Sequence, residues 1–400
     1  MKMHLNLTTA VLAAVAILAA CGGGLSGQPS PMNAYSALPL GPALGPPQTP
    51  ARHDPWQLVK SANEGHKLGN VLYAVADISS GDAWAVGAWP ARSPYLTDTL
   101  AEHWNGTKWA IVRTPRTLMP TAQLNSIAAM ASNAVWAAGY VENPGCICGH
   151  TLVDHWNGSA WTRLKTPNPG IADFLAGISA VSAQEIWAAG DEWPNQGYDV
   201  PLILRWDGKQ WAPLVLNQYQ LATLYSVYAP AHNDAWAFGF WGCCTTLVLR
   251  WNGTSWTRVP FADTAQIISL SGTSSSDVWA AGYYYCGSSC NPEARLFHWD
   301  GVQWMRVYIY GFQAPSLISG ISAIAPDDVW FTGYGTVFPK WQNHISNVTY
   351  HWNGKKWSDV TNPDQIGCCV LNAISARADD AWDVGQGGDK GTFTMHYTAR

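Results

Sequence analysis

Eight of the nine cysteines in this chain form four local pairs, and their spacing decides which chemistry they can support. An even, locally paired set predicts disulfides in an exported protein, first within each pair or, alternatively, as staples between neighbouring loops. A bond between adjacent cysteines is strained, because their Cα atoms lie about 3.8 Å apart and disulfides usually need about 4.4–6.8 Å. Thiolates at this spacing can also bind Zn²⁺ or Cu⁺, but oxidation outside the cytoplasm favours disulfides and no metal. The pairs are Cys146-x-Cys148, Cys243-Cys244, Cys286-x₃-Cys290 and Cys368-Cys369.

Tryptophan is the second group with a chemical use, and the chain contains 24 of them. Twenty recur at fixed positions of a repeat, so we expect them to form the core. Four do not recur, and several tyrosines lie near them in the sequence. Exposed rings of this kind can stack on sugars or anchor a protein partner, although they can also pack loops onto the domain. The set is Trp89, Trp193, Trp241 and Trp341, with Tyr95, Tyr198, Tyr284 and Tyr285.

The motifs of common enzymes are missing from the sequence. There is no Gly-x-Ser-x-Gly, no His-Glu-x-x-His and no phosphate-binding glycine loop. The net charge is −5 without a Lys/Arg cluster, which argues against a nucleic-acid partner. The sequence therefore favours binding over catalysis and predicts no cofactor.

The elements that must position these residues come from one repeat of about fifty residues. A Trp-Ala-x-Gly element recurs along the chain, as Trp-Phe-Thr-Gly and Trp-Asp-Val-Gly in its last two copies. Each copy is followed by a variable loop, an apolar segment ending in His-Trp or Arg-Trp, a turn such as Asn-Gly, and a further Trp. The leading tryptophans are Trp84, Trp136, Trp187, Trp236, Trp279, Trp330 and Trp382.

Each repeat predicts four short antiparallel strands. In the second copy we expect strands over 124–130, 135–140, 151–156 and 161–165, with a tight turn at Asn157-Gly158 because Asn-Gly favours positive φ. A four-stranded unit at this period is typical of a β-propeller blade. Five histidines, at one position of the third strand, are expected to be structural: His103, His155, His298, His351 and His396.

The two ends of the repeat region predict how the sheet closes. The last copy stops after its third strand, expected over 393–397, whereas residues 55–59 resemble a fourth strand with Trp56 in the matching position. We therefore predict an all-β, seven-bladed propeller over residues 55–400, in which the N-terminal strand completes the last blade and leaves no long unpaired edge.

The predicted topology sorts the loops onto two faces. The turns between strands one and two and between strands three and four are short and uniform, which indicates scaffold. The other loops vary, and variable loops carry function more often. The four non-repeat tryptophans and all eight paired cysteines fall at this variable loop face.

The N-terminus predicts export and anchoring. Lys2, an apolar run over 5–20 and Leu18-Ala19-Ala20-Cys21 form a secretory signal. Residues 22–54 are rich in Gly and Pro and predict a tether. Leu-Ala-Ala-Cys resembles the bacterial lipobox, which implies that residues 1–20 are removed and that Cys21 is lipidated; an ordinary signal peptide ending in Cys is the alternative.

The repeat resembles kelch-type propellers, with Gly after the second strand and Trp opening the fourth. It is closer still to bacterial secreted proteins built from Asp-Val-Trp-Ala-x-Gly and His-Trp-Asn-Gly, over residues 55–400. The resemblance implies a propeller fold but little about activity. Quinoprotein dehydrogenases also combine Trp-rich blades with adjacent cysteines in some members.

Together these features predict a membrane-anchored, extracytoplasmic, monomeric protein that presents an aromatic, disulfide-stiffened loop face to a carbohydrate or protein ligand. The expected ligand-binding residues are Trp89, Trp193, Trp241, Trp341, Tyr198 and Tyr284. A propeller enzyme, either a quinoprotein-like oxidoreductase or a glycan-active hydrolase, with its site at the channel mouth of the same face is the alternative, and a purely structural protein is a third.

Overall fold

The computed structural model describes residues 56–65, 69–93, 96–143, 148–195, 197–242, 245–284, 292–309, 316–337, 344–360, 369–387 and 391–398. The chain divides into two compact units, Met1–Asp54 and Pro55–Arg400, and all described residues belong to the second. No helix among them is long and apolar enough to span a membrane.

The described fold is all-β, and its strands group into antiparallel units of four, numbered here from one to seven along the chain. First strands are β2 (Val71–Ser79), β6 (Thr121–Ala131), β10 (Ala172–Ser182), β14 (Ala222–Ala231), β18 (Gln266–Ser274), β22 (Leu317–Ala325) and β26 (Val370–Arg377). Second strands are β3 (Asp82–Ser93), β7 (Ala134–Glu142), β11 (Glu185–Trp193), β15 (Asp234–Trp241), β19 (Asp277–Tyr284), β23 (Asp328–Val337) and β27 (Asp380–Gln386).

The fourth strand of each unit is the shortest. Third strands are β4 (Leu96–Trp104), β8 (Gly149–Trp156), β12 (Val200–Trp206), β16 (Thr245–Trp251), β20 (Glu293–Trp299), β24 (His344–Trp352) and β28 (Thr392–Thr398). Fourth strands are β5 (Trp109–Ile111), β9 (Trp161–Leu164), β13 (Trp211–Val215), β17 (Trp256–Arg258), β21 (Trp304–Arg306), β25 (Trp357–Asp359) and, for unit seven, β1 (Trp56–Val59). A single parallel pair, Ala172 with Gly149, joins units two and three into one sheet.

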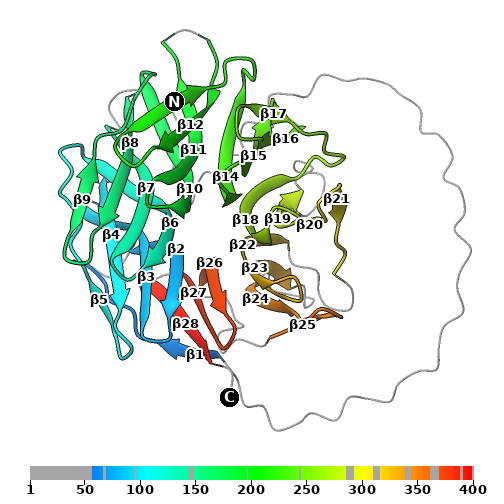
Figure 1. Cartoon of the computed structure of the whole chain (residues 1–400). Helices are drawn as coiled ribbons and strands as arrows, with labels where there is room; N and C mark the ends of the chain where they lie inside the picture. The colour runs from blue at the N-terminus through cyan, green and yellow to red at the C-terminus, as the bar shows by residue number, and fades with distance from the viewer. Residues whose placement is uncertain are drawn as a thin grey trace, which may run out of the picture. The chain divides into compact units, whose positions relative to one another are not determined.

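The units are arranged around a common centre, with their first strands innermost (Figure 1). Each first strand contacts the first strand of the next unit, and β26 contacts β2 in the same way. Side chains of unit seven hydrogen-bond to the backbone of unit one there: the Ser375 hydroxyl accepts from the Asp77 amide at 3.0 Å, and the Asn372 amide donates to the Leu72 carbonyl at 2.8 Å. The last unit therefore packs beside the first.

The repeated glycine follows from a bulge that all seven first strands share. In unit four the pairing of β14 with β15 skips a residue between Leu224 and Ser226. The bulge brings the Thr223 carbonyl oxygen to within 1.9 Å of where a Cβ on Gly239 would lie. Only glycine fits this position, and the other six repeat glycines meet the same contact at 1.8–2.1 Å.

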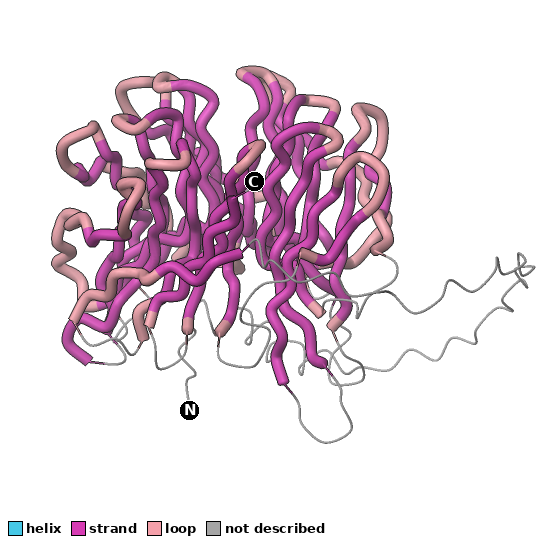
Figure 2. The backbone as a smooth tube through the Cα atoms, turned by 90° about the horizontal axis from the view of Figure 1, so that it is seen from below, coloured by secondary structure: helices cyan, strands magenta, loops and turns pink. Residues whose placement is uncertain are grey.

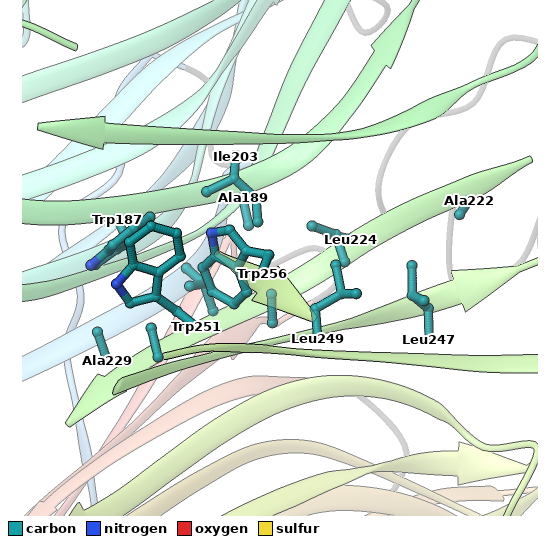
Figure 3. Close-up of a cluster of buried hydrophobic side chains, with 13 residues drawn as sticks. Trp187, Ala189, Ile203, Ala222, Leu224, Ala229, Leu247, Leu249, Trp251 and Trp256 are labelled. Carbon is teal, nitrogen blue, oxygen red and sulfur yellow. The ribbon is translucent and has the colours of Figure 1, made fainter. Parts of the chain in front are cut away.

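Tryptophans fill the spaces between units, as the repeat predicts. Between units three and four, Trp187 is fully buried and lies edge-on to Trp256, with ring centroids 5.4 Å apart. Trp251 lies 5.2 Å from the same ring, and aliphatic side chains such as Leu224 continue the cluster (Figure 3). The seven repeat tryptophans of the second strands are at most 4% exposed, which confirms their core role.

The five repeated histidines stack on these tryptophans and are structural, as expected. His103 lies 4.4 Å from the Trp84 ring, and its Nε2 hydrogen-bonds to Asp82 at 2.8 Å. His298 and His351 make the same contacts with Asp277 and Asp328, as does His396 with Asp380. His155 stacks on Trp136 at 4.2 Å, but unit two has Ala134 where those units have aspartate.

The strands run between two ends of the domain, where the connections gather (Figure 2). At one end, the turn face, Gly158 has φ 94° and the Asn157 side chain accepts the Ser159 amide at 3.0 Å, so the predicted Asn-Gly turn is confirmed. The opposite end, the loop face, holds the variable connections. The four strands expected in unit two are all present, with boundaries shifted by three residues at most.

The N-terminal strand pairs where the sequence predicts. β1 is antiparallel to β28, with Trp56 opposite Tyr397 and Val59 opposite Thr394. Trp56 is 1% exposed and packs against the rings of Trp330 and Tyr397. The first described strand thus supplies the fourth strand of the last unit.

Candidate functional site

Several predicted site residues lie outside the described residues. These are Trp341, Tyr95, Tyr285 and six of the paired cysteines, Cys146, Cys243, Cys244, Cys286, Cys290 and Cys368. The described cysteines are Cys148, which precedes β8, and Cys369, which precedes β26. Both positions belong to the loop face, but the pairing of the eight cysteines stays a prediction, as does lipidation of Cys21.

Three of the predicted aromatic residues pack against the domain. Trp89 lies partly buried over the core between units seven and one. The Trp241 indole donates to the Gln220 carbonyl at 2.9 Å, and Arg258 lies over its ring at 4.8 Å. Arg295 lies 5.0 Å from the Tyr284 ring in the same manner.

Trp193 and Tyr198 are the two predicted aromatics that face solvent, with 37% and 58% of their surface exposed. Trp193 is the last residue of β11, and Tyr198 lies in the connection from β11 to β12 in unit three. This connection and its neighbours form one surface, defined here as the loop platform: residues 170–173, 193–195, 197–199, 216–222 and 241–242.

Backbone hydrogen bonds hold the loop platform together. The Ile171 amide donates to the Trp193 carbonyl at 2.8 Å, which ties the start of β10 to the end of β11. The Leu221 amide donates to the Asp199 carbonyl at 2.8 Å, and the Gly242 amide donates to the Leu221 carbonyl at the same distance. Units three and four therefore share one fixed surface at the loop face.

Leu221 holds an unusual backbone conformation in this surface. Its φ is 64°, and it is the only residue other than glycine with a positive φ in the described chain. A left-handed leucine is strained by about 1–2 kcal/mol, and such strain gathers at functional sites. The two hydrogen bonds of the Leu221 backbone, with Asp199 and Gly242, maintain this conformation, and the Leu221 side chain is 51% exposed.

The loop platform gathers exposed apolar side chains. Ile171, Trp193, Tyr198 and Leu221 are between 37% and 58% exposed. They account for four of the nine large apolar residues that are exposed among the described ones. Apolar side chains concentrated on a rigid polar-rimmed surface indicate a binding site.

Carboxylates from the same unit lie beside these apolar groups. Burial raises the pKa of Asp191 to about 8, with further contributions from the charges of Asp199 and Asp173. Burial likewise raises the pKa of Asp173 to about 6 and that of Asp199, whose carboxylate also accepts a hydrogen bond from Trp193. Next to them, burial and the charge of Asp191 raise the pKa of Tyr225 to about 12. The group therefore offers a neutral acid and a phenol at neutral pH.

The sequence analysis missed these carboxylates, although the repeat contained a signal for one of them. Asp191 directly follows the repeat glycine Gly190, a position at which the other units have Ala88, Tyr140, Phe240, Tyr283, Tyr334 and Gln386. An acid at a position that is uncharged in the other six units marks unit three as different. Its proximity to Tyr225 depends on the packing of units three and four.

Among protein families and curated proteins, nothing matches the sequence. Solved structures do resemble the fold. A YCF48 structure bound to a D1 peptide matches with TM-score 0.53 and 14% identity, covering 87% of this chain and 98% of that one. A GH74 xyloglucanase from Xanthomonas campestris matches with TM-score 0.54 and 12% identity, covering 85% of this chain and 53% of that one.

A PL25 ulvan lyase bound to a sugar ligand also matches, with TM-score 0.50 and 10% identity, covering 86% of this chain and 96% of that one. This chain spans about half the length of the xyloglucanase. At these identities the resemblance concerns the fold alone, and it identifies an all-β, propeller-like protein.

Proposed function

We propose that residues 55–400 form a seven-bladed β-propeller of kelch-like repeats whose ring is closed by β1. The strand count fits seven units of four. The pairing of β1 with β28 and the packing of β26 against β2 support closure between the last blade and the first.

We propose from the N-terminal sequence that this propeller is an exported lipoprotein. Cys21 is its lipid anchor, and residues 22–54 are its tether. Several acyl chains at about 0.8 kcal/mol per buried CH₂ would hold it on a bacterial membrane. Mass spectrometry of the mature N-terminus tests this, and Cys21→Ala should release the protein into the soluble fraction. An unacylated mature N-terminus at any other residue would contradict the anchor.

The function that the site supports best is carbohydrate binding at the loop platform. The observation that carries it is that exposed Trp193 and Tyr198 share one hydrogen-bonded surface, close to the Asp191 carboxyl group, whose pKa is raised to about 8. Aromatic faces stack on sugar rings, and carboxyl groups pair with sugar hydroxyls. The structural neighbours include a xyloglucanase and an ulvan lyase with a bound sugar, which is compatible with this proposal.

A glycan array with the mature protein, followed by titration of the best glycan, tests the proposal. Trp193→Ala and Tyr198→Ala should each weaken binding at least about tenfold, as expected for aromatic anchors. Leu221→Gly should weaken it too while relieving backbone strain, so that its stability does not fall. Tyr308→Ala removes a ring that is 55% exposed in unit five and should leave binding unchanged.

Binding of peptides but of no glycan would redirect the proposal to a protein ligand, as in the peptide-bound neighbour. Unchanged affinity in both aromatic variants would remove the loop platform from the site altogether.

A glycan-active enzyme is the second candidate, and Asp191 is the reason. A carboxyl group with its pKa raised to about 8 is protonated at neutral pH, as a general acid must be. Release of reducing ends from the bound glycan, lost in Asp191→Asn while binding persists, would establish catalysis. Binding without any product over long incubation would leave the protein a lectin.

The eight paired cysteines are proposed to stiffen the loop face by disulfides. A non-reducing peptide map distinguishes bonds within each pair from bonds between loops. Free thiols at these positions in the exported protein would contradict both arrangements.

A further inference from the structure

A cavity of about 400 Å³ opens at the turn face, the end of the domain opposite the loop platform. It lies between units three and four. Its polar lining comes from turns and adjoining strand residues of unit three and from one turn of unit four: Ser182, Gln184, Glu185, Arg205, Asp207 and His232. The volume falls in the range of small-molecule sites, about 300–1,000 Å³.

Glu185 connects the two units inside this cavity. In unit four the corresponding carboxylate is Asp234, which pairs with Arg250 at 2.8 Å. Glu185 pairs with Arg205 at 2.9 Å in the same way, but its longer side chain also lets its second oxygen contact His232 Nδ1 of the next unit. The Glu185 side chain is 5% exposed, whereas that of His232 is 68% exposed.

A buried carboxylate therefore orients an exposed imidazole. When Nδ1 donates its hydrogen to Glu185, the neutral ring presents the Nε2 lone pair as an acceptor. In the described residues no protein group hydrogen-bonds to that nitrogen. The contact with Glu185 therefore orients the His232 ring.

The turn that carries His232 departs from the repeat. Backbone carbonyls at the matching position accept a hydrogen bond from the indole of the third-strand tryptophan: Trp104 donates to the Ser80 carbonyl at 3.1 Å and Trp299 to the Ser275 carbonyl at 3.2 Å. The Trp251 indole of unit four is buried and lacks such a partner. In unit four this hydrogen bond is absent, and His232 contacts Glu185 instead. Positions that depart from the pattern of their own fold are often functional.

The charges of the cavity limit what it can hold. Arg205 and Glu185 neutralise each other, and Asp207 leaves the lining negative. An anion would therefore face the uncompensated charge of Asp207. A neutral polyhydroxyl ligand avoids this conflict, because each hydroxyl can donate to Asp207 or His232 and accept from Arg205 or Gln184.

We propose that this cavity is a second binding site, independent of the loop platform, which takes one neutral sugar unit with a hydroxyl donating to Nε2 of His232. The probes are glucose, galactose and mannose, with glucuronate as the anionic counterpart. Calorimetric titration of the mature protein at pH 7.5 should show binding of a neutral sugar, and glucuronate should bind at least tenfold more weakly.

Two variants replace a cavity residue with the residue that other units have at the same position. His232→Ser restores the residue of Ser80 and Ser275, and it should weaken binding at least tenfold without loss of folding. Glu185→Asp keeps the pairing with Arg205, as in unit four, but is too short for His232, and it should weaken binding while the unfolding temperature stays the same. Trp193→Ala alters only the loop platform and should leave this affinity unchanged.

Three results overturn the proposal. They are failure of every neutral sugar at its solubility limit, unchanged affinity in His232→Ser, or loss of binding in Trp193→Ala. The last result would move the sugar to the loop platform and leave the glycan proposal for that surface intact.

Discussion

At the scale of residues, each position of the repeat keeps the same residue type where the seven units make the same contact. A unit that has a different residue at such a position differs visibly from the others. The repeat glycine is set by a carbonyl oxygen of the bulged first strand. The third-strand histidine is set by its stacking on tryptophan and by an aspartate at the turn. Where the aspartate is missing, as at Ala134, the histidine keeps its ring contact alone.

Gly239→Ala should destabilise the fold by at least about 3 kcal/mol, because its Cβ would lie 1.9 Å from the Thr223 oxygen inside a rigid sheet. Gly242→Ala is the control: its φ of 64° costs about 1–2 kcal/mol, but its Cβ meets nothing within 4 Å. Chemical denaturation of both variants measures the difference. Equal losses would show that backbone conformation, and not the bulge contact, selects the glycine.

Ala134→Asp should stabilise unit two by about 1 kcal/mol, because it gives His155 the hydrogen-bond partner that four other units have. Burial lowers the pKa of His155 below 6.5, so its stabilising contribution is present at higher pH and lost as pH falls. The new carboxylate favours the protonated ring, and the gain should be larger at pH 5 than at pH 8. Thermal melts at both pH values test this, and a smaller gain at pH 5 would contradict it.

At the scale of elements, β1 has a special position because it is separated from its partner strand by nearly the whole domain. Its pairing with β28 covers an edge that would otherwise stay open. Trp56 adds a buried ring between units six and seven through its contacts with Trp330 and Tyr397. Four residues thus connect the two ends of the described chain.

Trp56→Ala should cost about 3–5 kcal/mol, the usual loss for a buried tryptophan, and should expose β26–β28 to proteolysis first. Leu58→Ala lies on the same strand, where the side chain is 54% exposed, and should change stability by less than about 0.5 kcal/mol. Denaturation with limited proteolysis reads out both effects. A small loss in Trp56→Ala would mean that β1 contributes little to the last unit.

At the scale of the whole molecule, buried acids gather where the last units meet the first. Burial raises the pKa of Asp383 to about 8, although Thr349 donates to it at 2.8 Å. Burial also raises the pKa of Glu102 to about 7, although the Ser61 hydroxyl and the Ala62 amide donate to it. Asp77 lies at the junction of units seven and one, and its pKa is raised to about 7 by burial and by Asp380.

These acids predict that stability falls as pH rises. The pKa of Asp383 is about 8 in the folded protein against 3.8 for the free group, so its contribution is complete below about pH 4 and lost as pH rises through about 8. Asp383→Asn should therefore reduce the loss of stability between pH 5 and pH 8.5. Asp379→Asn removes an exposed charge of the same unit as a control. Identical pH profiles in wild type and Asp383→Asn would contradict the assignment.

Much of this architecture could be predicted from the sequence, because the same residue types recur at the same positions in seven repeats. Trp136, Gly139 and Asn157-Gly158 each have a local or nearest-neighbour cause: ring burial, a bulge contact, and a turn with positive φ. The pairing of β1 with β28 could be predicted from the number of strands in each repeat. The last repeat lacks a fourth strand, and the N-terminal segment resembles a fourth strand that belongs to no other repeat. Of the predicted aromatics, Trp193 and Tyr198 face solvent, whereas Trp241 packs through its indole and ring.

By itself the sequence determined the strands, the core tryptophans and the pairing of the two ends, since these depend on periodicity and on contacts within or between adjacent repeats. Only the tertiary structure decided which loops share a surface. Asp199, Leu221 and Gly242 are joined by hydrogen bonds across two units, and the charge of Asp191 raises the pKa of Tyr225 there. The reach of Glu185 to His232 has the same origin. Such contacts depend on how one unit packs against the next. The sequence of either unit alone does not determine the distance between residues of the two units.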